Sequence, residues 1–202
     1  MCCASNMGIG WTRYTARRAR FSPFVRCIAL LHSVVLPGGE RLRMADLIAV
    51  AQALGLSRAT TFGSTGNLLF ETEPKTLSGL QDALEDAFFD RFGKRIAFVL
   101  RPAEAFLALA GRSPFDAGHD PQNIAVRVMR EPYAQDFADR LLPYADGAKL
   151  AVVDGDLWIG FPEKPTGSRL LSRIAGGKAA TVGTFRTLAM IQRISAQLES
   201  EA

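Results

Sequence analysis

The sequence has little of the side-chain chemistry on which most metal centres and redox sites depend. Its 202 residues include three cysteines, Cys2, Cys3 and Cys27, and two histidines, His32 and His119. None of the cysteines forms a C-x-x-C pair, and adjacent cysteines such as Cys2 and Cys3 are poor disulfide partners. We therefore expect no metal site, and this cysteine pattern is typical of a reducing compartment, which predicts a cytoplasmic protein.

Long apolar runs are also missing. No stretch of about eighteen consecutive apolar residues occurs, so we expect no membrane-spanning helix and no membrane partner. With 48% hydrophobic and 22% charged residues, the chain has the composition of a globular protein. This balance excludes a collagen-like chain, a disulfide-stabilised miniprotein and a wholly disordered chain. The length allows one domain of ordinary size or two small ones.

Acidic residues are absent from residues 1–25, which contain four arginines. The formal net charge of the whole chain is +4, so residues 26–202 are neutral overall. We interpret residues 1–24 as a basic leader outside the folded body. It is a flexible arm, a targeting peptide or, in the interpretation that we favour, disordered upstream sequence before a natural start near Val25.

Apolar periodicity and turn residues predict the first set of elements after the leader. Leu77, Leu80, Leu84, Phe88 and Phe92, for example, lie on one helical stripe. The predicted order is strand, helix, strand, strand, helix, strand, over residues 26–32, 44–54, 58–62, 68–71, 77–92 and 95–100.

The same order then repeats after a helical connector at 102–111 and a loop up to residue 121. Asp154-Gly155-Asp156 is a strong hairpin signal between two of the later strands, because a primed turn needs positive φ. The second set is predicted at 123–129, 133–142, 148–153, 157–161, 166–175 and 179–182, followed by a closing helix at 184–198.

These orders predict an α+β fold with two consecutive ferredoxin-like subdomains of the βαββαβ, or α-β plait, type. We place the subdomains at 25–101 and 122–202, with the connector and loop at 102–121 between them and the closing helix at the C-terminal end. Each subdomain has roughly 70–80 residues, which is small for independent stability, so we expect the two to bury apolar surface against one another.

Several segments in a fixed order carry a resemblance to a known family. Over about residues 26–195 the chain resembles a widespread bacterial family, domain of unknown function 1697. The resemblance implies two ferredoxin-like subdomains and no established activity. The segments are Ala29-Leu30-Leu31, Met44-Ala45-Asp46-Leu47, Leu54-Gly55-Leu56, Gly66-Asn67-Leu68-Leu69-Phe70, Ser113-Pro114-Phe115, Ser168-Arg169-Leu170, Ala180-Thr181 and Thr187.

The chain departs from that family's pattern at several polar positions. His32 stands where the pattern has arginine and Val35 where it has asparagine. Ser64-Thr65-Gly66-Asn67 replaces Gln-Ser-Gly-Asn, and Gly183-Thr184-Phe185-Arg186-Thr187 replaces Arg-Asn-Trp-Asn-Thr. If those positions form a site in the family, the resemblance implies that it is lost or retuned in this chain.

Two clusters could bind an anion. Residues 164–198 contain six basic residues and no acid. Within this block Arg169 and Arg173 share a helix face, and Ser168 lies near that helix's N-terminus, where free N–H groups favour an anion. The candidate residues of this basic face are Ser168, Arg169, Arg173, Lys178 and Arg186. The competing interpretation is a solvated face whose charge is balanced by acids elsewhere.

The second cluster is the glycine-flanked turn at 63–67. Backbone N–H groups beside Ser64, Thr65 and Asn67 could form a small anion nest. The competing interpretation is a hairpin loop, in which glycine and asparagine supply positive φ.

The function predicted from the sequence is therefore non-enzymatic binding of an anionic ligand, such as a nucleotide or RNA. The alternative is a small enzyme that acts on a phosphorylated or acidic metabolite in a cleft between the subdomains. The sequence identifies no catalytic residue and no cofactor, and it does not decide whether the protein is an enzyme.

Overall fold

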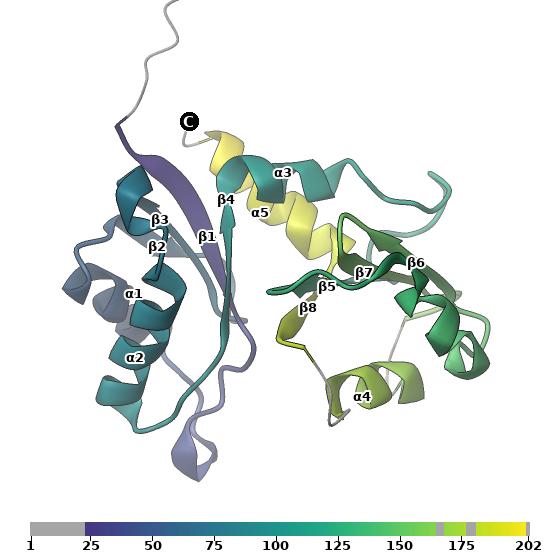
Figure 1. The fold of residues 1–202 in the computed structure, drawn as a ribbon, viewed down its shortest axis with the longest axis horizontal. Helices are drawn as coiled ribbons and strands as arrows, with labels where there is room; N and C mark the ends of the chain where they lie inside the picture. Colours follow the sequence, from purple (N-terminus) through teal and green to yellow (C-terminus); the bar gives the residue numbers. More distant parts are fainter. Residues whose placement is uncertain (1–22, 165–167, 177–180, 201–202) are drawn as a thin grey trace, which may run out of the picture.

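Two four-stranded antiparallel sheets organise the chain (Figure 1). The computed structural model describes residues 23–164, 168–176 and 181–200. The strand order is β2-β3-β1-β4 in the first sheet and β6-β7-β5-β8 in the second, so the two sheets have the same topology. The fold is mixed α+β. No helix in these described ranges is long and apolar enough to cross a membrane.

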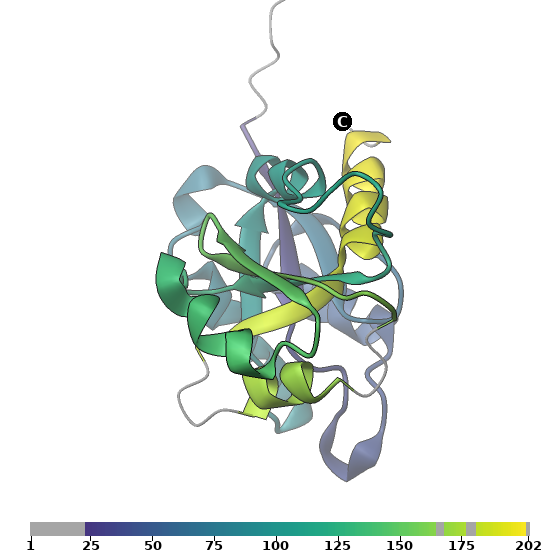
Figure 2. The same cartoon turned by 90° about the vertical axis from the view of Figure 1, so that its right-hand side faces the viewer.

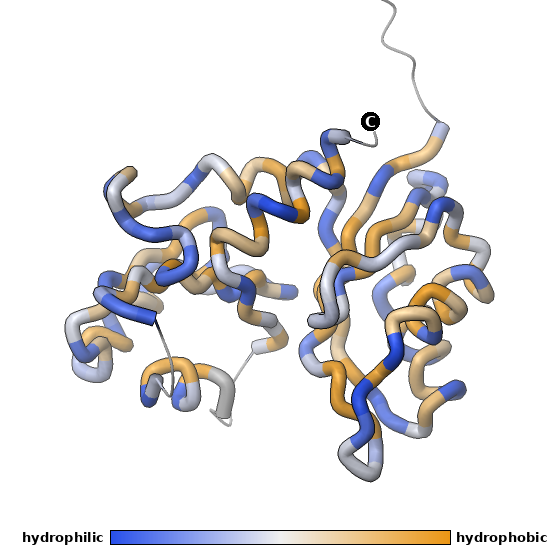
Figure 3. The backbone as a smooth tube through the Cα atoms, turned by 180° about the vertical axis from the view of Figure 1, so that it is seen from behind, coloured by the Kyte–Doolittle hydropathy of each residue, from blue (hydrophilic) through white to orange (hydrophobic). Residues whose placement is uncertain are grey.

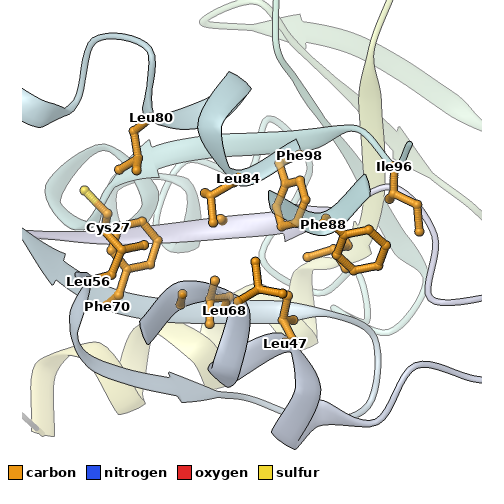
Figure 4. Packing of buried hydrophobic residues seen from close by; sticks show 14 of the residues in the cluster. Cys27, Leu47, Leu56, Leu68, Phe70, Leu80, Leu84, Phe88, Ile96 and Phe98 are labelled. Atoms are coloured by element: carbon orange, nitrogen blue, oxygen red, sulfur yellow. The ribbon is translucent and has the colours of Figure 1, made fainter. Parts of the chain in front are cut away.

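The first sheet has two helices against one of its faces. Successive side chains of β1 point to opposite faces of the sheet. Cys27, Ala29 and Leu31 face the helices, whereas Ile28 and Leu30 face the opposite side. Figure 4 shows Leu47, Leu84 and Phe88 packed over the sheet. The elements are β1 (Val25–Leu31), α1 (Met44–Ala53), β2 (Ser57–Thr61), β3 (Asn67–Thr72), α2 (Leu80–Phe92) and β4 (Phe98–Pro102).

The second sheet is covered on one face by short helices. Its outer core includes Leu141, Leu157, Ile159 and Ile174. The elements are β5 (Ile124–Met129), the 3₁₀ helices η3 (Gln135–Phe137) and η4 (Asp139–Tyr144), β6 (Lys149–Val153), β7 (Asp156–Gly160), α4 (Arg169–Gly176) and β8 (Gly183–Thr187). In Figure 3, hydrophobic stretches recur along the strands and helices, with hydrophilic loops between them.

The remaining faces of the two sheets share a third core. Helices α3 (Ala103–Ala110) and α5 (Leu188–Ser200) pack side by side in it, as Figures 1 and 2 show. Two ion pairs also join the halves: Arg130 with Glu85, and Arg101 with Asp156 at 3.4 Å. The two halves therefore bury apolar surface against one another, as the sequence analysis expects. This core contains Ile28, Leu30, Leu69, Val99, Phe106, Leu109, Ile124, Val126, Val128, Trp158, Leu188, Ile191, Ile194 and Leu198.

Four predicted elements of the second half differ from those in the structure. The helix predicted at 133–142 is two 3₁₀ segments, and Pro143 lies inside the second, where an α-helix would lose a hydrogen bond. The last strand is at 183–187 instead of 179–182, so the final helix begins at Leu188 instead of 184. The helix predicted from residue 166 is described from Arg169 onward. The leader predicted at 1–24 lies, up to residue 22, outside the described residues.

Candidate functional site

A pocket of about 330 Å³ lies where the end of β1 meets the edge strand β8. The first half contributes the end of β1, the residues that follow it and the β2–β3 turn. The second half contributes β5 and β8, so the pocket spans the boundary between the halves. Its lining consists of Leu31, His32, Ser33, Val34, Thr65, Arg127, Gly183, Thr184, Phe185 and Arg186.

Arg186 is a buried arginine, 7% exposed, that ties β8 to the first half. Its Nε donates to Asn67 Oδ1 at 2.6 Å. Its four terminal N–H groups have four further neutral acceptors at 2.8–3.3 Å, so all five donors of the guanidinium are used within the protein. Burial lowers the pKa of Arg186 to about 10. The four terminal acceptors are Thr184 Oγ1 and the carbonyls of Phe185, Leu31 and Thr65.

Arg127 of β5 is more deeply buried, at 1% exposure, and its donors are only partly used. Nη1 donates to the Ile174 carbonyl at 2.7 Å and Nη2 to the Thr181 carbonyl at 3.1 Å. Nε has no hydrogen-bond partner in the part of the chain that the structure describes, and the guanidinium carbon lies 5.4 Å from the centre of the Phe185 ring. Burial lowers the pKa of Arg127. A guanidinium has five N–H donors, so three of them lack an acceptor among the described residues. Nε is enclosed by the protein, which leaves one unpaired N–H group on each terminal nitrogen for a ligand.

A glycine permits the close approach of β8 to this arginine. A Cβ atom on Gly183 would lie 2.9 Å from Arg127 Nε and 2.4 Å from Met129 Sδ. Only glycine therefore lets the backbone of β8 pass so near the guanidinium without displacing it.

The pocket is strongly cationic. No acidic residue is part of its lining, and neither Arg127 nor Arg186 forms an ion pair within the described ranges. Two further cations lie one residue away from the lining. Arg41 donates to the Ser64 carbonyl at 3.3 Å, and Lys94 donates to the Val35 carbonyl at 2.5 Å.

Two hydroxyl groups add hydrogen-bond donors. Thr65 Oγ1 accepts from Asn67 Nδ2 at 3.0 Å, and Ser33 Oγ accepts from the Val35 N–H at 3.2 Å. Because each oxygen already accepts a bond, its hydrogen can be donated to a ligand. His32 Nδ1 donates to the Gly183 carbonyl at 2.9 Å, which leaves Nε2 as its second polar atom. The pocket thus presents donors and cations, which is the chemistry that receives an oxyanion.

The structure brings together residues that the sequence analysis assigns to two separate clusters. Arg186 of the basic C-terminal block contacts Asn67 and Thr65 of the glycine-flanked turn, and the Ser64 carbonyl is bound by Arg41. His32, Thr65 and residues 183–186, where the chain departs from the family pattern, all line this one pocket.

The other predicted residues lie elsewhere. Ser168 Oγ accepts from the Leu171 N–H at 3.3 Å in the first turn of α4. Arg169 is exposed, and Arg173 stacks on Tyr144 with its guanidinium carbon 3.9 Å from the ring centre. None of these three side chains lines the pocket. Lys178 lies outside the described residues.

A second pocket, of about 540 Å³, lies between α3 and the β6–β7 turn, and its charges largely neutralise one another. Arg101 pairs with Asp156, and Arg112 pairs with Asp154. Burial raises the pKa of Asp156. Across the part of the chain that the structure describes, no cluster of histidine, cysteine and carboxylate side chains could hold a metal ion.

Comparison with known proteins shows the family of the chain. No curated protein matches it. The solved structure of a conserved bacterial protein, SP0830 from Streptococcus pneumoniae, resembles it with a TM-score of 0.64 over 87% of this chain and 99% of that one. At 19% identity this likeness shows the fold alone. The model of a family described as "Protein of unknown function (DUF1697)" matches residues 25–158, about two thirds of the sequence, so the chain belongs to that family, as its sequence motifs predict.

Proposed function

We propose that the protein is a binding module that takes up the oxyanion group of a small molecule in the pocket lined by Arg127 and Arg186. The observation that carries this proposal is Arg127. This arginine is almost fully buried beside a cavity, and among the described residues no carboxylate pairs with it and its Nε has no partner. A buried charge is costly unless it is paired and hydrogen-bonded, and an oxyanion would supply both the missing charge and the missing acceptors.

The two buried arginines have different roles in this proposal. Arg186 is fully hydrogen-bonded within the protein, so it positions the β2–β3 turn and adds positive charge without donating to the ligand. Arg127, with one unpaired N–H group on each terminal nitrogen, donates to the ligand directly. Arg169 and Arg173 are exposed and lie outside the pocket. The proposed site is therefore the pocket and not the basic face of α4 that the sequence suggests.

Binding is favoured over catalysis by the partners of the polar side chains. Ser33 Oγ and His32 Nδ1 are both engaged with the backbone and not with each other, so the lining offers no activated nucleophile. A cavity of about 330 Å³ has the size of a small-molecule site and favours a metabolite over RNA.

The proposal also includes the subdomain structure of the chain and the location of the protein in the cell. Each half has the strand order of a ferredoxin-like unit, which supports ferredoxin-like subdomains at 25–101 and 122–202 joined by the segment 102–121. We place the protein in the cytoplasm, on the cysteine usage that the sequence analysis describes.

The test is isothermal titration of the purified protein with phenyl phosphate and with benzoate. We expect Arg127→Gln to weaken binding of whichever ligand binds by about 10- to 100-fold, since hydrogen bonds to charged groups contribute about 1.5–3 kcal/mol. The matched control is Arg140→Gln, which removes the same charge from an exposed position on η4.

Thermal unfolding of each variant shows whether it is folded. Thr65→Val, at an exposed turn position, is a second variant in case Arg127→Gln does not fold, and we expect it to weaken binding by about tenfold. Equal affinities of wild type and folded Arg127→Gln, or an equal loss in Arg140→Gln, would contradict the proposed site.

A further inference from the structure

We infer that the bound group is the dianionic phosphate of a phosphate monoester, with its organic part against the apolar portion of the pocket lining. This inference rests on the proposed function, and it adds the charge and the class of the ligand. It is carried by three features of the pocket: the number of uncompensated cations, the number of available donors, and the division of the lining into a polar and an apolar part.

The charge of the pocket favours a dianion. Arg127 and Arg186 are both at most 7% exposed, and neither is ion-paired within the described residues. A monoanion such as a carboxylate or a sulfate ester would leave one of these two buried charges uncompensated, which is costly at low local dielectric. A phosphate monoester carries nearly two negative charges above its second pKa of about 6, so it balances both arginines. Arg41 and Lys94, one residue away from the lining, add to the same field.

The donors of the pocket come from three different side chains. Arg127 has one unpaired N–H group on each terminal nitrogen, and the hydroxyls of Ser33 and Thr65 supply two more donors. A carboxylate has two oxygens with about four acceptor sites, whereas a phosphate monoester has three strongly accepting terminal oxygens. The phosphate therefore matches this set of donors better.

The rest of the pocket is apolar and has room for more than the phosphate. Leu31, Val34 and Phe185 complete the lining. A volume of about 330 Å³ lies in the range of small-molecule sites and exceeds the size of one phosphoryl group. Apolar walls with a few convergent polar groups are typical of small-molecule sites. An apolar or planar organic group of about six non-hydrogen atoms is expected to occupy this part.

The experiment compares three ligands by isothermal titration at about pH 8, where phosphate monoesters are dianionic. Phenyl phosphate is the dianionic probe, phenyl sulfate is its monoanionic counterpart of the same shape, and inorganic phosphate lacks the ring. We expect phenyl phosphate to bind at least about tenfold more tightly than either of the others. In Arg127→Gln the preference for phenyl phosphate over phenyl sulfate should fall to less than about threefold, because one buried charge is gone.

Val34→Ser tests the apolar contact separately. Val34 is half-buried in a loop. We expect the substitution to weaken the binding of phenyl phosphate by about threefold to tenfold and to leave the affinity for inorganic phosphate unchanged. It also serves as a folded variant if Arg127→Gln fails to fold.

Each contrary outcome has a distinct meaning. Equal affinity for phenyl phosphate and phenyl sulfate would overturn the dianion inference and leave the oxyanion site standing. Equal affinity for phenyl phosphate and inorganic phosphate would overturn the assignment of an organic group. Failure of all three ligands, and of benzoate, to bind would overturn the proposed function together with this inference.

Discussion

A buried guanidinium requires acceptors for its N–H groups and compensation for its charge. Arg186 meets the first requirement within the protein, because neutral oxygens from three segments surround it. Arg127 meets it only in part, and both arginines lack an ionic partner among the described residues. Arg186 therefore shapes the pocket, whereas Arg127 provides hydrogen-bond donors for a ligand.

Replacement of Arg186 by methionine tests its structural role. The change removes the Arg186 donor from the Thr65 carbonyl and the Asn67 amide oxygen and leaves the Leu31 carbonyl with Thr184 Oγ1, so we expect the free energy of unfolding to fall by about 3 kcal/mol. Urea titration measures the change. Arg186→Lys, which keeps the charge but has fewer donors, should recover only part of it. If both variants were as stable as the wild type, this role of Arg186 would be wrong.

Asp156 is expected to make stability depend on pH. Burial raises its pKa above the ordinary value of 3.8, although Met129 N–H and Arg101 oppose the shift. A raised folded pKa means that the group's contribution to stability is complete below the unfolded pKa and is lost as pH rises through the folded pKa.

The stability of the wild type relative to Asp156→Asn should therefore be greatest below about pH 4 and should decline as the pH rises from there toward neutrality. Urea unfolding of both proteins across this range measures the difference, and other carboxylates cancel because both proteins share them. A difference that stayed constant or grew with pH would contradict the raised pKa.

Among the elements, the β2–β3 turn that contributes to the pocket depends on glycine at position 66. Gly66 has φ +72°, and a Cβ there would lie 2.8 Å from Leu31 Cβ and 3.0 Å from Val34 Cγ1. We expect Gly66→Ala to cost about 2–5 kcal/mol, from backbone strain and overpacking together. Gly63 has φ +65° and no neighbour closer than Met190 Cε at 3.9 Å, so Gly63→Ala should cost only about 1–2 kcal/mol. Thermal unfolding measures the stability of both variants. Equal losses of stability in Gly66→Ala and Gly63→Ala would contradict the close contact between Gly66 and β1.

Apolar periodicity predicts most of the elements because it records which face is buried. The stripe from Leu80 to Phe92 is α2, and the Asp154-Gly155 turn joins β6 to β7. Periodicity fails at β8, whose sequence begins with glycine and contains Arg186. A buried arginine with neutral partners looks like a surface residue in the sequence, because its acceptors Asn67, Leu31 and Thr65 come from the other half of the chain.

The candidate site was only partly predictable for the same reason. Arg186, Thr65 and Asn67 are named by the sequence analysis, but the spacing of 119 residues between Asn67 and Arg186 conceals that they touch. Arg127 is missed. The available signal was its position within Ile124–Met129, a strand in which every residue is buried, where a charged side chain requires a compensating partner or ligand.

Because the two halves share a buried core, we expect them to unfold as one cooperative unit. Leu30 is fully buried in this core, together with residues of β5 and α5. We expect Leu30→Ala to destabilise the protein by about 2–5 kcal/mol and to lower the protection of β1 and β5 amides equally. Native-state hydrogen exchange measures both strands, and a loss of protection confined to β1 would show that the halves unfold separately.

The oxyanion pocket at the boundary of the halves is tested most directly by crystals soaked in tungstate, a tetrahedral dianion with a strong anomalous signal. We predict that the highest anomalous peak lies in the pocket, within hydrogen-bond distance of the Arg127 guanidinium. Peaks confined to exposed arginines such as Arg169, with the pocket empty, would contradict the assignment.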